Sequence, residues 1–278
     1  MLIVTLVLVM FLVSIAAGLV GSLVGLGGGV VVIPMLTIFL GVDIHFAIGA
    51  SIVSVIATSS GAAATYVKDK MTNLRIGMFL ELGTTAGAIV GALVSAYVDS
   101  VVLELVFGSI LLVSLIPLIR QIGEDIPKSP ELEGLAKRLS LTGSYEEIDG
   151  SMVNYNAARP GRGLAGMVVA GLVSGLLGIG SGTFKVLSMD LAMKLPMKVS
   201  TTTSNFMIGV TAAASAGIYF VRGDVDPVIV APVALGILIG AYAGSRLLGR
   251  ARNPTVRKIF ALVLAVAGIE MVLSAFGI

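Results

Sequence analysis

The amino-acid sequence predicts an all-α, polytopic integral membrane protein. It is expected to contain two inverted-topology repeats, each with a glycine-broken helical hairpin and three spanning helices. Three observations lead to this fold class: the composition, the length of the apolar segments, and a glycine-rich motif that occurs twice. Of 278 residues, 56% are apolar and 12% are charged, and the mean hydropathy is +1.05. Soluble domains carry about a quarter charged residues, so most of this chain is predicted to lie in a membrane.

The composition also narrows the classes of function. The chain has no cysteine, which excludes disulfides, thiolate metal sites and cysteine nucleophiles. His45 is the single histidine, and the sequence contains neither the HExxH pattern of zinc proteases nor a phosphate-binding Walker motif. We therefore expect no enzyme activity, no metal and no cofactor. The net charge of +2 is too small to indicate a nucleic-acid partner.

A glycine-rich motif recurs at a fixed offset of 153 residues. The run Gly25–Gly29 matches Gly178–Gly182, and at the same offset Ser51 falls on Ser204. This shared register indicates a tandem duplication. The predicted units are a first transmembrane repeat at 1–122, a cytoplasmic polar linker at 123–162 and a second transmembrane repeat at 163–278.

Each half contains four apolar segments, and the first of them must break. Leu2–Leu40 would reach roughly 58 Å as one helix, whereas the hydrocarbon core of a bilayer is about 30 Å thick. The run Gly25–Gly29 permits the irregular backbone that such a break needs. The predicted segments are Leu2–Leu40, Ile44–Val67, Leu74–Val98, Val101–Ile119, Leu164–Leu195, Val199–Val221, Pro227–Leu248 and Lys258–Phe276.

The distribution of lysine and arginine distinguishes two topologies. If each broken segment folds back, 16 of the 18 basic residues lie on one side, with Arg222 on the other side and Lys185 inside a hairpin. If each segment crosses once, the split falls to 10 against 7. Basic residues concentrate in cytoplasmic loops. We therefore expect fold-back hairpins, both termini outside, the linker in the cytoplasm, and two halves of inverted orientation.

Inverted repeats with a broken helix at matching positions indicate a secondary transporter whose site lies where the repeats meet. After each glycine turn a short helix begins, and its first amides lack partners and carry the positive end of the helix dipole. Two such ends favour an anion, although glycines of this kind can also serve tight helix packing. The predicted substrate-binding residues are Gly27, Gly28, Gly29, Ser51, Gly180, Ser181, Gly182, Lys185, Ser204 and Asn205.

Two charged residues inside apolar segments complete the predicted site. Lys185 follows the second glycine turn, where a cation at membrane depth is costly and marks function. The alternative is that its side chain snorkels to the cytoplasmic interface. Glu81 is a proton-coupling candidate, or else an interfacial carboxylate paired with Arg75 or another cytoplasmic cation. The hydroxyls of Ser51 and Ser204 offer uncharged donors, or else they bond their own helix or a neighbouring one.

Other polar and small residues are given structural roles. The glycines Gly83, Gly87 and Gly91, which are spaced by four, are predicted to let helices pack closely. The linker at 123–162 is expected to be flexible, apart from a short amphipathic helix within 132–141.

The residues of the duplicated motif also carry a family likeness. They are the run Gly18–Gly29, the triplet Val32-Ile33-Pro34, and Phe184-Lys185-Val186 in the second copy. With these residues the chain, apart from its linker, resembles the TauE/SafE sulfite exporter family. The resemblance implies a small membrane permease of bacteria and archaea that handles sulfite, sulfonates or related organosulfur anions, often as an exporter. Ser181 in place of glycine and Leu187 in place of proline depart from the family pattern in the second turn.

These observations favour a gradient-coupled secondary transporter that exports a small anion, with sulfite or a small organosulfonate as the favoured substrate. A gated anion channel is one alternative, and a cation antiporter that uses Glu81 is another. The expected partners are the anion, the lipid bilayer and a coupling proton or ion, and a homo-oligomer stays open. The expected location is the plasma membrane of a bacterium or archaeon, with several crossings.

Overall fold

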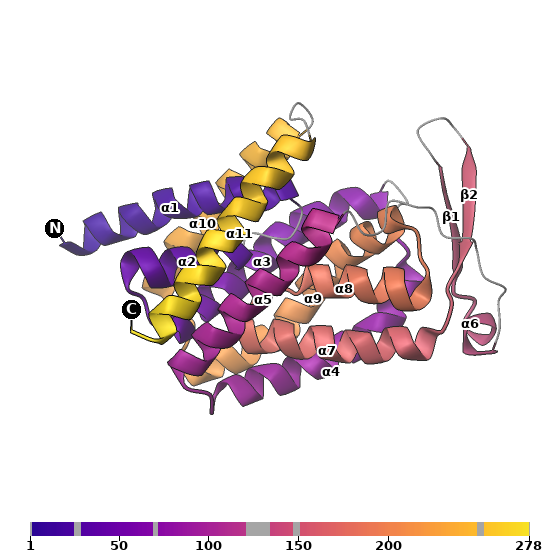
Figure 1. Ribbon diagram of the computed structural model, residues 1–278, viewed down its shortest axis with the longest axis horizontal. Helices are drawn as coiled ribbons and strands as arrows, with labels where there is room; N and C mark the ends of the chain where they lie inside the picture. Colours follow the sequence, from indigo (N-terminus) through magenta and orange to yellow (C-terminus); the bar gives the residue numbers. More distant parts are fainter. Residues whose placement is uncertain are drawn as a thin grey trace.

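The computed structural model describes residues 2–24, 29–68, 72–120, 134–146, 151–248 and 253–277. Helices run along the long axis of the molecule, and both termini lie at one end of it (Figure 1). A small β-hairpin lies at the opposite end. The helices of the first half are α1 (Leu2–Val24), α2 (Gly29–Pro34), the π-helical turn η1 (Met35–Phe39), α3 (Ile44–Lys68), α4 (Leu74–Ser95) and α5 (Ser100–Arg120).

The second half repeats this order after a short polar segment. That segment holds α6 (Gly134–Arg138), β1 (Thr142–Glu146) and β2 (Met152–Asn156). The helices that follow are α7 (Pro160–Leu177), α8 (Gly182–Leu187), the π-helical turn η2 (Ser188–Ala192), α9 (Met197–Arg222), α10 (Pro227–Leu248) and α11 (Asn253–Ala275).

The helices have the composition of a membrane protein. Within the described part of the chain, α4, α7 and α9 are long and apolar enough to cross a bilayer. Shorter apolar stretches lie in the other long helices and in α2 with η1. The predicted helical membrane architecture is confirmed at this level, and the predicted segments agree closely with the observed helices.

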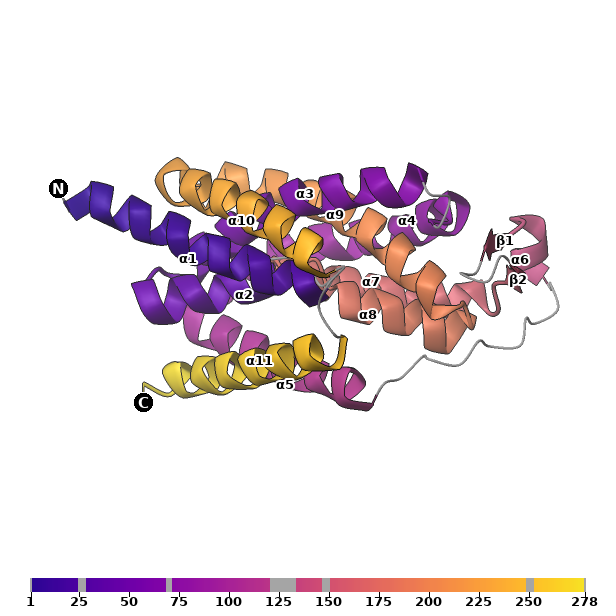
Figure 2. The same ribbon diagram turned by 90° about the horizontal axis from the view of Figure 1, so that it is seen from above.

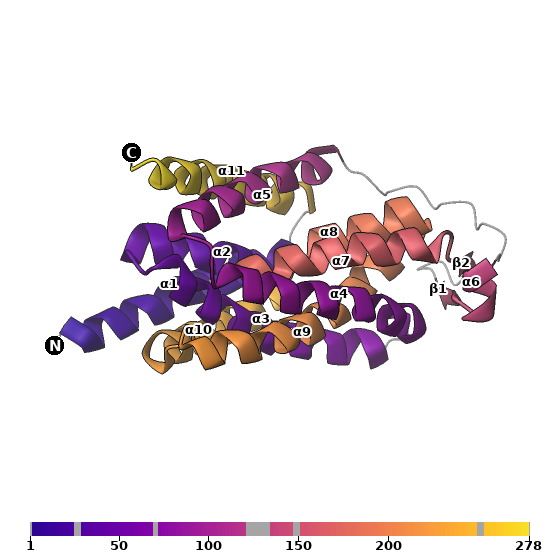
Figure 3. The same ribbon diagram turned by 90° about the horizontal axis from the view of Figure 1, so that it is seen from below.

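The most extensive helix pairs join the two halves of the chain. They are α1 with α10, α4 with α7, α3 with α9 and α5 with α11. Figure 3 shows α5 beside α11 along one side of the molecule and α4 beside α7. Each of the long helices α1, α3, α4 and α5 thus has its main partner in the second half.

Glycines allow two of these pairs to approach closely. A methyl group added at Gly87 or Gly91 of α4 would collide with the carbonyl oxygen of Val168 or of Leu172 on α7. On α10, Gly240 lies in the same way against a backbone carbonyl of α1. The packing role predicted for the glycines spaced by four is therefore confirmed.

The first apolar segment of each half breaks and turns back. α1 ends at Val24 and α2 begins at Gly29, so the break falls on the predicted glycine run. α2 then runs back toward the end of the molecule where α1 began, and α8 runs back along α7 in the same manner (Figure 2). The start of α2 and the second break therefore lie in the interior of the molecule, away from both ends.

The linker differs from its prediction. A short helix, α6, lies within the expected range, but the flexible chain expected after it is instead an antiparallel hairpin of β1 and β2. Tyr145 pairs with Val153 across the hairpin, and Tyr155 follows on the same face. Both tyrosines are buried, and Val153 packs beside them against the helices. The polar composition concealed this alternation of apolar side chains, which is typical of a strand with one buried face.

Asn73 attaches the hairpin to the helices. Its side-chain oxygen caps α4 by accepting from the Ile76 amide at 3.0 Å. Its side-chain nitrogen donates to the carbonyl of Thr142 at 3.0 Å and to the Tyr155 hydroxyl at 2.9 Å. Its backbone amide donates to the Thr203 hydroxyl on α9 at 3.2 Å. One residue thus holds the hairpin, α4 and α9 together.

A second polar cluster lies at the opposite end, in the loop before α3. The Asp43 carboxylate accepts from the backbone amide of His45 at 2.9 Å and from the Ser100 hydroxyl at 3.0 Å, and it lies 3.0 Å from His45 Nδ1. Partial burial acts to raise the pKa of Asp43, but the hydrogen bonds outweigh it and hold that pKa below its ordinary value. The cluster links the start of α3 to the start of α5.

Candidate functional site

The backbone of the second break is held in left-handed geometry. After α7 ends, Gly178, Gly180 and Ser181 have φ angles of +66°, +70° and +45°. Glycine adopts this region readily, whereas a serine needs compensation. The Ser181 hydroxyl supplies it by donating to the Ala170 carbonyl at 2.6 Å. The residue that departs from the family pattern is thus fixed by a local hydrogen bond.

The start of α2 meets the second break in the interior. Ser51 on α3 donates its hydroxyl to the carbonyl of Gly178 at 2.8 Å. A methyl group added at Gly29 would collide with the Ser51 hydroxyl and would lie 2.7 Å from Val55 Cγ2 and 3.4 Å from the Gly178 carbonyl oxygen. The start of α2, the part of α3 around Ser51 and Val55, and the second break therefore form one tightly packed junction. Gly27 and Gly28, two predicted site residues, lie outside the described residues.

On the other side of this junction α9 holds the second break. Ser204, which corresponds to Ser51 in the repeat, donates its hydroxyl to the Gly182 carbonyl at 3.2 Å. Gly180 packs against Ile208 and Val55. Asn205 follows Ser204 on α9 and is half-buried. In this conformation the predicted serine donors are occupied by backbone carbonyls.

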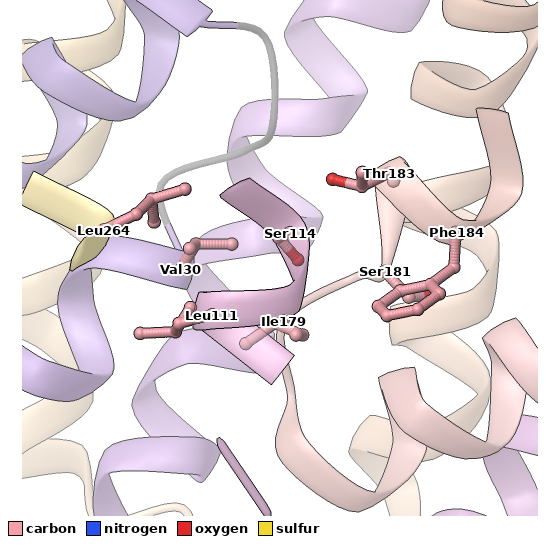
Figure 4. A pocket seen from close by; sticks show the side chains of 9 residues that line it. Val30, Leu111, Ser114, Ile179, Ser181, Thr183, Phe184 and Leu264 are labelled. Atoms are coloured by element: carbon pink, nitrogen blue, oxygen red, sulfur yellow. The ribbon is translucent and has the colours of Figure 1, made fainter. Parts of the chain in front are cut away.

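A small cavity lies beside the second break. Its volume is about 20 Å³, which is room for roughly one water molecule. Figure 4 shows residues of both halves around it, with Ser114, Ser181 and Thr183 as the polar side chains. The other lining residues are Val30, Leu111, Ile179, Gly182, Phe184 and Leu264. An anion larger than water would need this space to open.

Lys185 lies on α8, directly after the residues that line the cavity. Its side chain is fully buried, so it does not snorkel to the interface. The ammonium nitrogen donates to the hydroxyl of Thr211 on α9 at 2.6 Å. The lysine is therefore held inside the protein, between α8 and α9.

Glu81 approaches the same hydroxyl from α4. Its Oε1 accepts from Thr211 at 2.7 Å and from Thr85 at 3.1 Å. Its Oε2 is buried and has no hydrogen-bond partner among the described residues. The alternative pairing with Arg75 is not observed, because the Arg75 guanidinium is exposed and donates to the Ser140 carbonyl. Glu81 instead faces the interior.

The structure thus brings the predicted residues into two neighbouring groups. One is the junction of the two breaks, and the other is a polar network of Lys185, Thr211 and Glu81. Sequence reasoning missed Thr211, which joins the two charges. A signal was present, because Ser204, Thr211 and Ser215 are spaced by seven and four along α9 and share its buried face. Within the part of the chain that is described, no three His, Asp or Glu side chains gather as metal ligands.

This network can hold and exchange charge away from water. Lys185 brings three hydrogen-bond donors and Glu81, when ionised, brings only acceptors. The two charges balance each other across one hydroxyl, in a place where an uncompensated charge is expensive. A ligand charge that reached Lys185 would therefore alter the balance at Glu81.

Comparison with known proteins gives a family for this chain. Residues 10–271 match the family described as "Sulfite exporter TauE/SafE". The chain is 26% identical over 272 residues to the "Probable membrane transporter protein YunE" of Bacillus subtilis (strain 168), covering 95% of this chain and 96% of that protein. It is 25% identical over 264 residues to "Probable membrane transporter protein YdhB" of the same organism, covering 95% and 97%.

An archaeal protein is similar to the same extent. The "Probable membrane transporter protein MJ0441" of Methanocaldococcus jannaschii is 25% identical over 283 residues, covering 95% of this chain and 94% of that protein. No solved structure matches the chain. The family match extends over both halves and the polar segment between them, so the chain belongs to the sulfite exporter TauE/SafE family and is a membrane transporter.

Proposed function

We propose that the protein is a gradient-coupled secondary transporter that exports a small anion, with sulfite or a small organosulfonate as its favoured substrate. The observation that carries this proposal is the fully buried Lys185 beside the junction of the two breaks. A lysine at such a depth costs several kcal/mol unless an anionic partner compensates it. A transported anion would be such a partner in the occupied state.

We further propose that the two halves are inverted repeats, with both termini outside and the polar linker in the cytoplasm. Two observations support this arrangement. The main pairs are reciprocal, since α1 packs on α10 as its counterpart α7 packs on α4. Both termini lie at the end opposite the hairpin (Figure 1). Inverted repeats of this kind can alternate access to a site between them.

Binding would require a rearrangement at the second break. The cavity of about 20 Å³ is too small for an oxyanion of sulfur. We propose that the residues after the break, Ser181 to Lys185, move so that the amides that begin α8 and the Lys185 ammonium face the anion. The hydroxyls of Ser51 and Ser204 would exchange a carbonyl for the anion as acceptor.

Binding to purified protein tests the function. Sulfite, methanesulfonate, sulfoacetate, sulfate and acetate should be compared by calorimetry, and Lys185→Ala should weaken binding of the preferred anion about ten- to hundredfold, or about 1.4 to 2.8 kcal/mol. Lys137→Ala removes an exposed lysine from α6 and is the matched control. Unchanged affinity in folded Lys185→Ala would remove this lysine from the site.

A cation antiporter is the second candidate, because Glu81 Oε2 is a buried carboxylate oxygen with no hydrogen-bond partner in the described part of the chain. The same calorimetry with Na⁺, K⁺ and Mg²⁺ separates the two functions. Binding of a cation that Glu81→Gln abolishes, together with no binding of any anion, would replace the proposal. A gated channel would instead conduct the anion with no dependence on a coupling ion.

Cysteine labelling tests the orientation, since the chain has no native cysteine. Tyr97, between α4 and α5, is 91% exposed, and Ser140 is exposed beside the hairpin. In intact cells Tyr97→Cys should react with a membrane-impermeant maleimide and Ser140→Cys should not. The reverse pattern would overturn the orientation.

A further inference from the structure

We propose that Thr211 couples proton binding at Glu81 to anion binding at Lys185, so that the protein takes up a proton together with an anionic charge. This inference rests on the proposed function. It adds the residue that joins the two events and the direction of the coupling.

The geometry around Thr211 gives its hydroxyl two alternative hydrogen bonds. The Thr211 oxygen lies 2.6 Å from Lys185 Nζ, 2.7 Å from Glu81 Oε1 and 2.8 Å from the Met207 carbonyl oxygen. An ammonium group can only donate, so this oxygen accepts from Lys185. A hydroxyl has one hydrogen, and it can point to Glu81 or to Met207 but not to both.

The protonation state of Glu81 selects between these bonds. An ionised carboxylate only accepts, so it takes the Thr211 hydrogen. A protonated Glu81 can donate to the Thr211 oxygen, whose hydrogen then turns to the Met207 carbonyl. In both states the Thr211 oxygen accepts from Lys185. It accepts this bond alone while Glu81 is ionised and a second one, from Glu81, while Glu81 is protonated, so the protonation of Glu81 changes the acceptor that Lys185 meets without any displacement of the helices.

Charge balance sets the direction of the coupling. Lys185 and Glu81 together are neutral, so an anion at Lys185 leaves one excess negative charge in a buried site. Such a charge is unfavourable in an environment of low dielectric constant. A proton on Glu81 restores neutrality, and on Oε1 it reverses the direction of the hydrogen bond with Thr211 instead of breaking it. Binding of the anion at Lys185 and binding of the proton at Glu81 therefore strengthen each other.

The other charged groups on the neighbouring elements lie away from this network. Arg75 on α4, Arg162 on α7 and Lys198 on α9 are exposed, and Arg222 on α9 pairs with Asp224 at 3.0 Å. Asp190, in η2, and Lys194, just after η2, interact with each other. Lys185 is thus the charged side chain that acts on Glu81 from across the helix interface.

The coupling has a consequence for transport. A monoanion that moves together with a proton carries no net charge across the membrane, so the membrane potential does not act on this cotransport. Net movement then follows the combined gradients of anion and proton. Export occurs only where the outward gradient of the anion exceeds the inward gradient of the proton.

Calorimetry in buffers of different ionisation enthalpy measures how many protons the protein takes up for each anion that it binds. Methanesulfonate is the first probe because its charge is constant between about pH 5 and 9, and sulfite is the second, corrected for its own titration. The wild type should take up about one proton per anion bound. Its affinity for the anion should then fall about tenfold for each unit by which the pH rises, over the pH range in which the proton is taken up. Glu81→Gln and Thr211→Val should bind with a pH dependence of less than about twofold per unit.

Two variants keep the test independent of folding defects. Thr211→Ser retains the hydroxyl and should behave as the wild type. Thr58→Val removes a threonine whose hydroxyl donates to the Ser54 carbonyl of its own helix, as Thr211 lies against the Met207 carbonyl. Among the described residues Thr58 makes no hydrogen bond to a carboxylate, so this variant should also behave as the wild type. Anion binding without proton uptake, with proton release, or with a full pH dependence in Thr211→Val would overturn this inference and leave the proposed function intact. If neither probe bound at all, the proposed function itself would fail.

Discussion

Lys185 and Glu81 share one hydroxyl: the Thr211 oxygen lies 2.6 Å from Lys185 Nζ and 2.7 Å from Glu81 Oε1. Both side chains are buried, with Lys185 fully enclosed and Glu81 8% exposed. Two opposite charges in this position stabilise the fold only together, because either one alone would be an uncompensated charge in the interior. The network proposed to take part in transport is for this reason also expected to stabilise the fold.

Lys185→Met should lower the free energy of unfolding by about 3 kcal/mol, since it leaves Glu81 buried without a counter-charge. Adding Glu81→Gln should restore most of this loss, because the pair is then neutral and of similar shape. Thermal unfolding of the detergent-solubilised protein measures both variants. A double variant that is no more stable than Lys185→Met would contradict the mutual compensation of the two charges.

Gly29→Ala should destabilise the junction of the two breaks by about 1 to 3 kcal/mol, because the added methyl group collides with Ser51 and Val55. Gly161→Ala, near the start of α7, is the control, since nothing lies within 4 Å of the position its methyl group would occupy. The melting temperatures of the two variants should differ clearly. Equal melting temperatures would show that the junction can relax around a side chain.

Asn73→Ala should release the β-hairpin from the helices. It removes the cap of α4 and two hydrogen bonds to the hairpin, a loss of about 1 to 2 kcal/mol. Hydrogen exchange should speed up in β1 and β2 and at the start of α4, whereas α5 should be unaffected. Asn154→Ala alters an exposed position of β2 and serves as the control. Exchange that remains slow in the hairpin would mean that its buried tyrosines hold it without Asn73.

Asp43 should make stability depend on pH in the acid range. Its pKa is lower in the folded protein than in the unfolded chain, so its contribution is present above its ordinary pKa of about 4 and is lost as the pH falls through the folded value. Ser100→Ala removes one bond to the carboxylate and should reduce this dependence. Unfolding curves of the two proteins between about pH 3 and 7 check the expectation. Identical curves would exclude the Ser100 contact as a cause.

Sequence reasoning located the helices and the breaks because both leave local marks. Apolar length gives the spans, and the run Gly25–Gly29 marks the turn whose second copy ends at Gly182. It failed for Thr211, since the partner Glu81 is 130 positions away and one sequence contains no record of such a contact. It failed for the hairpin because three apolar side chains on one face are few enough to be hidden by polar neighbours.

The cross-pairing of the helices bears on how the protein is made. Helix α1 enters the membrane first, yet its main partner α10 begins only at Pro227, and α5 must likewise wait for α11. During synthesis the first half is therefore held in the bilayer with glycine-lined faces that have no neighbour. Expressed alone, such a half would offer these faces to other membrane proteins or to the quality-control proteases. The complete chain should become protease-resistant only after its last helices have been inserted, in one late step.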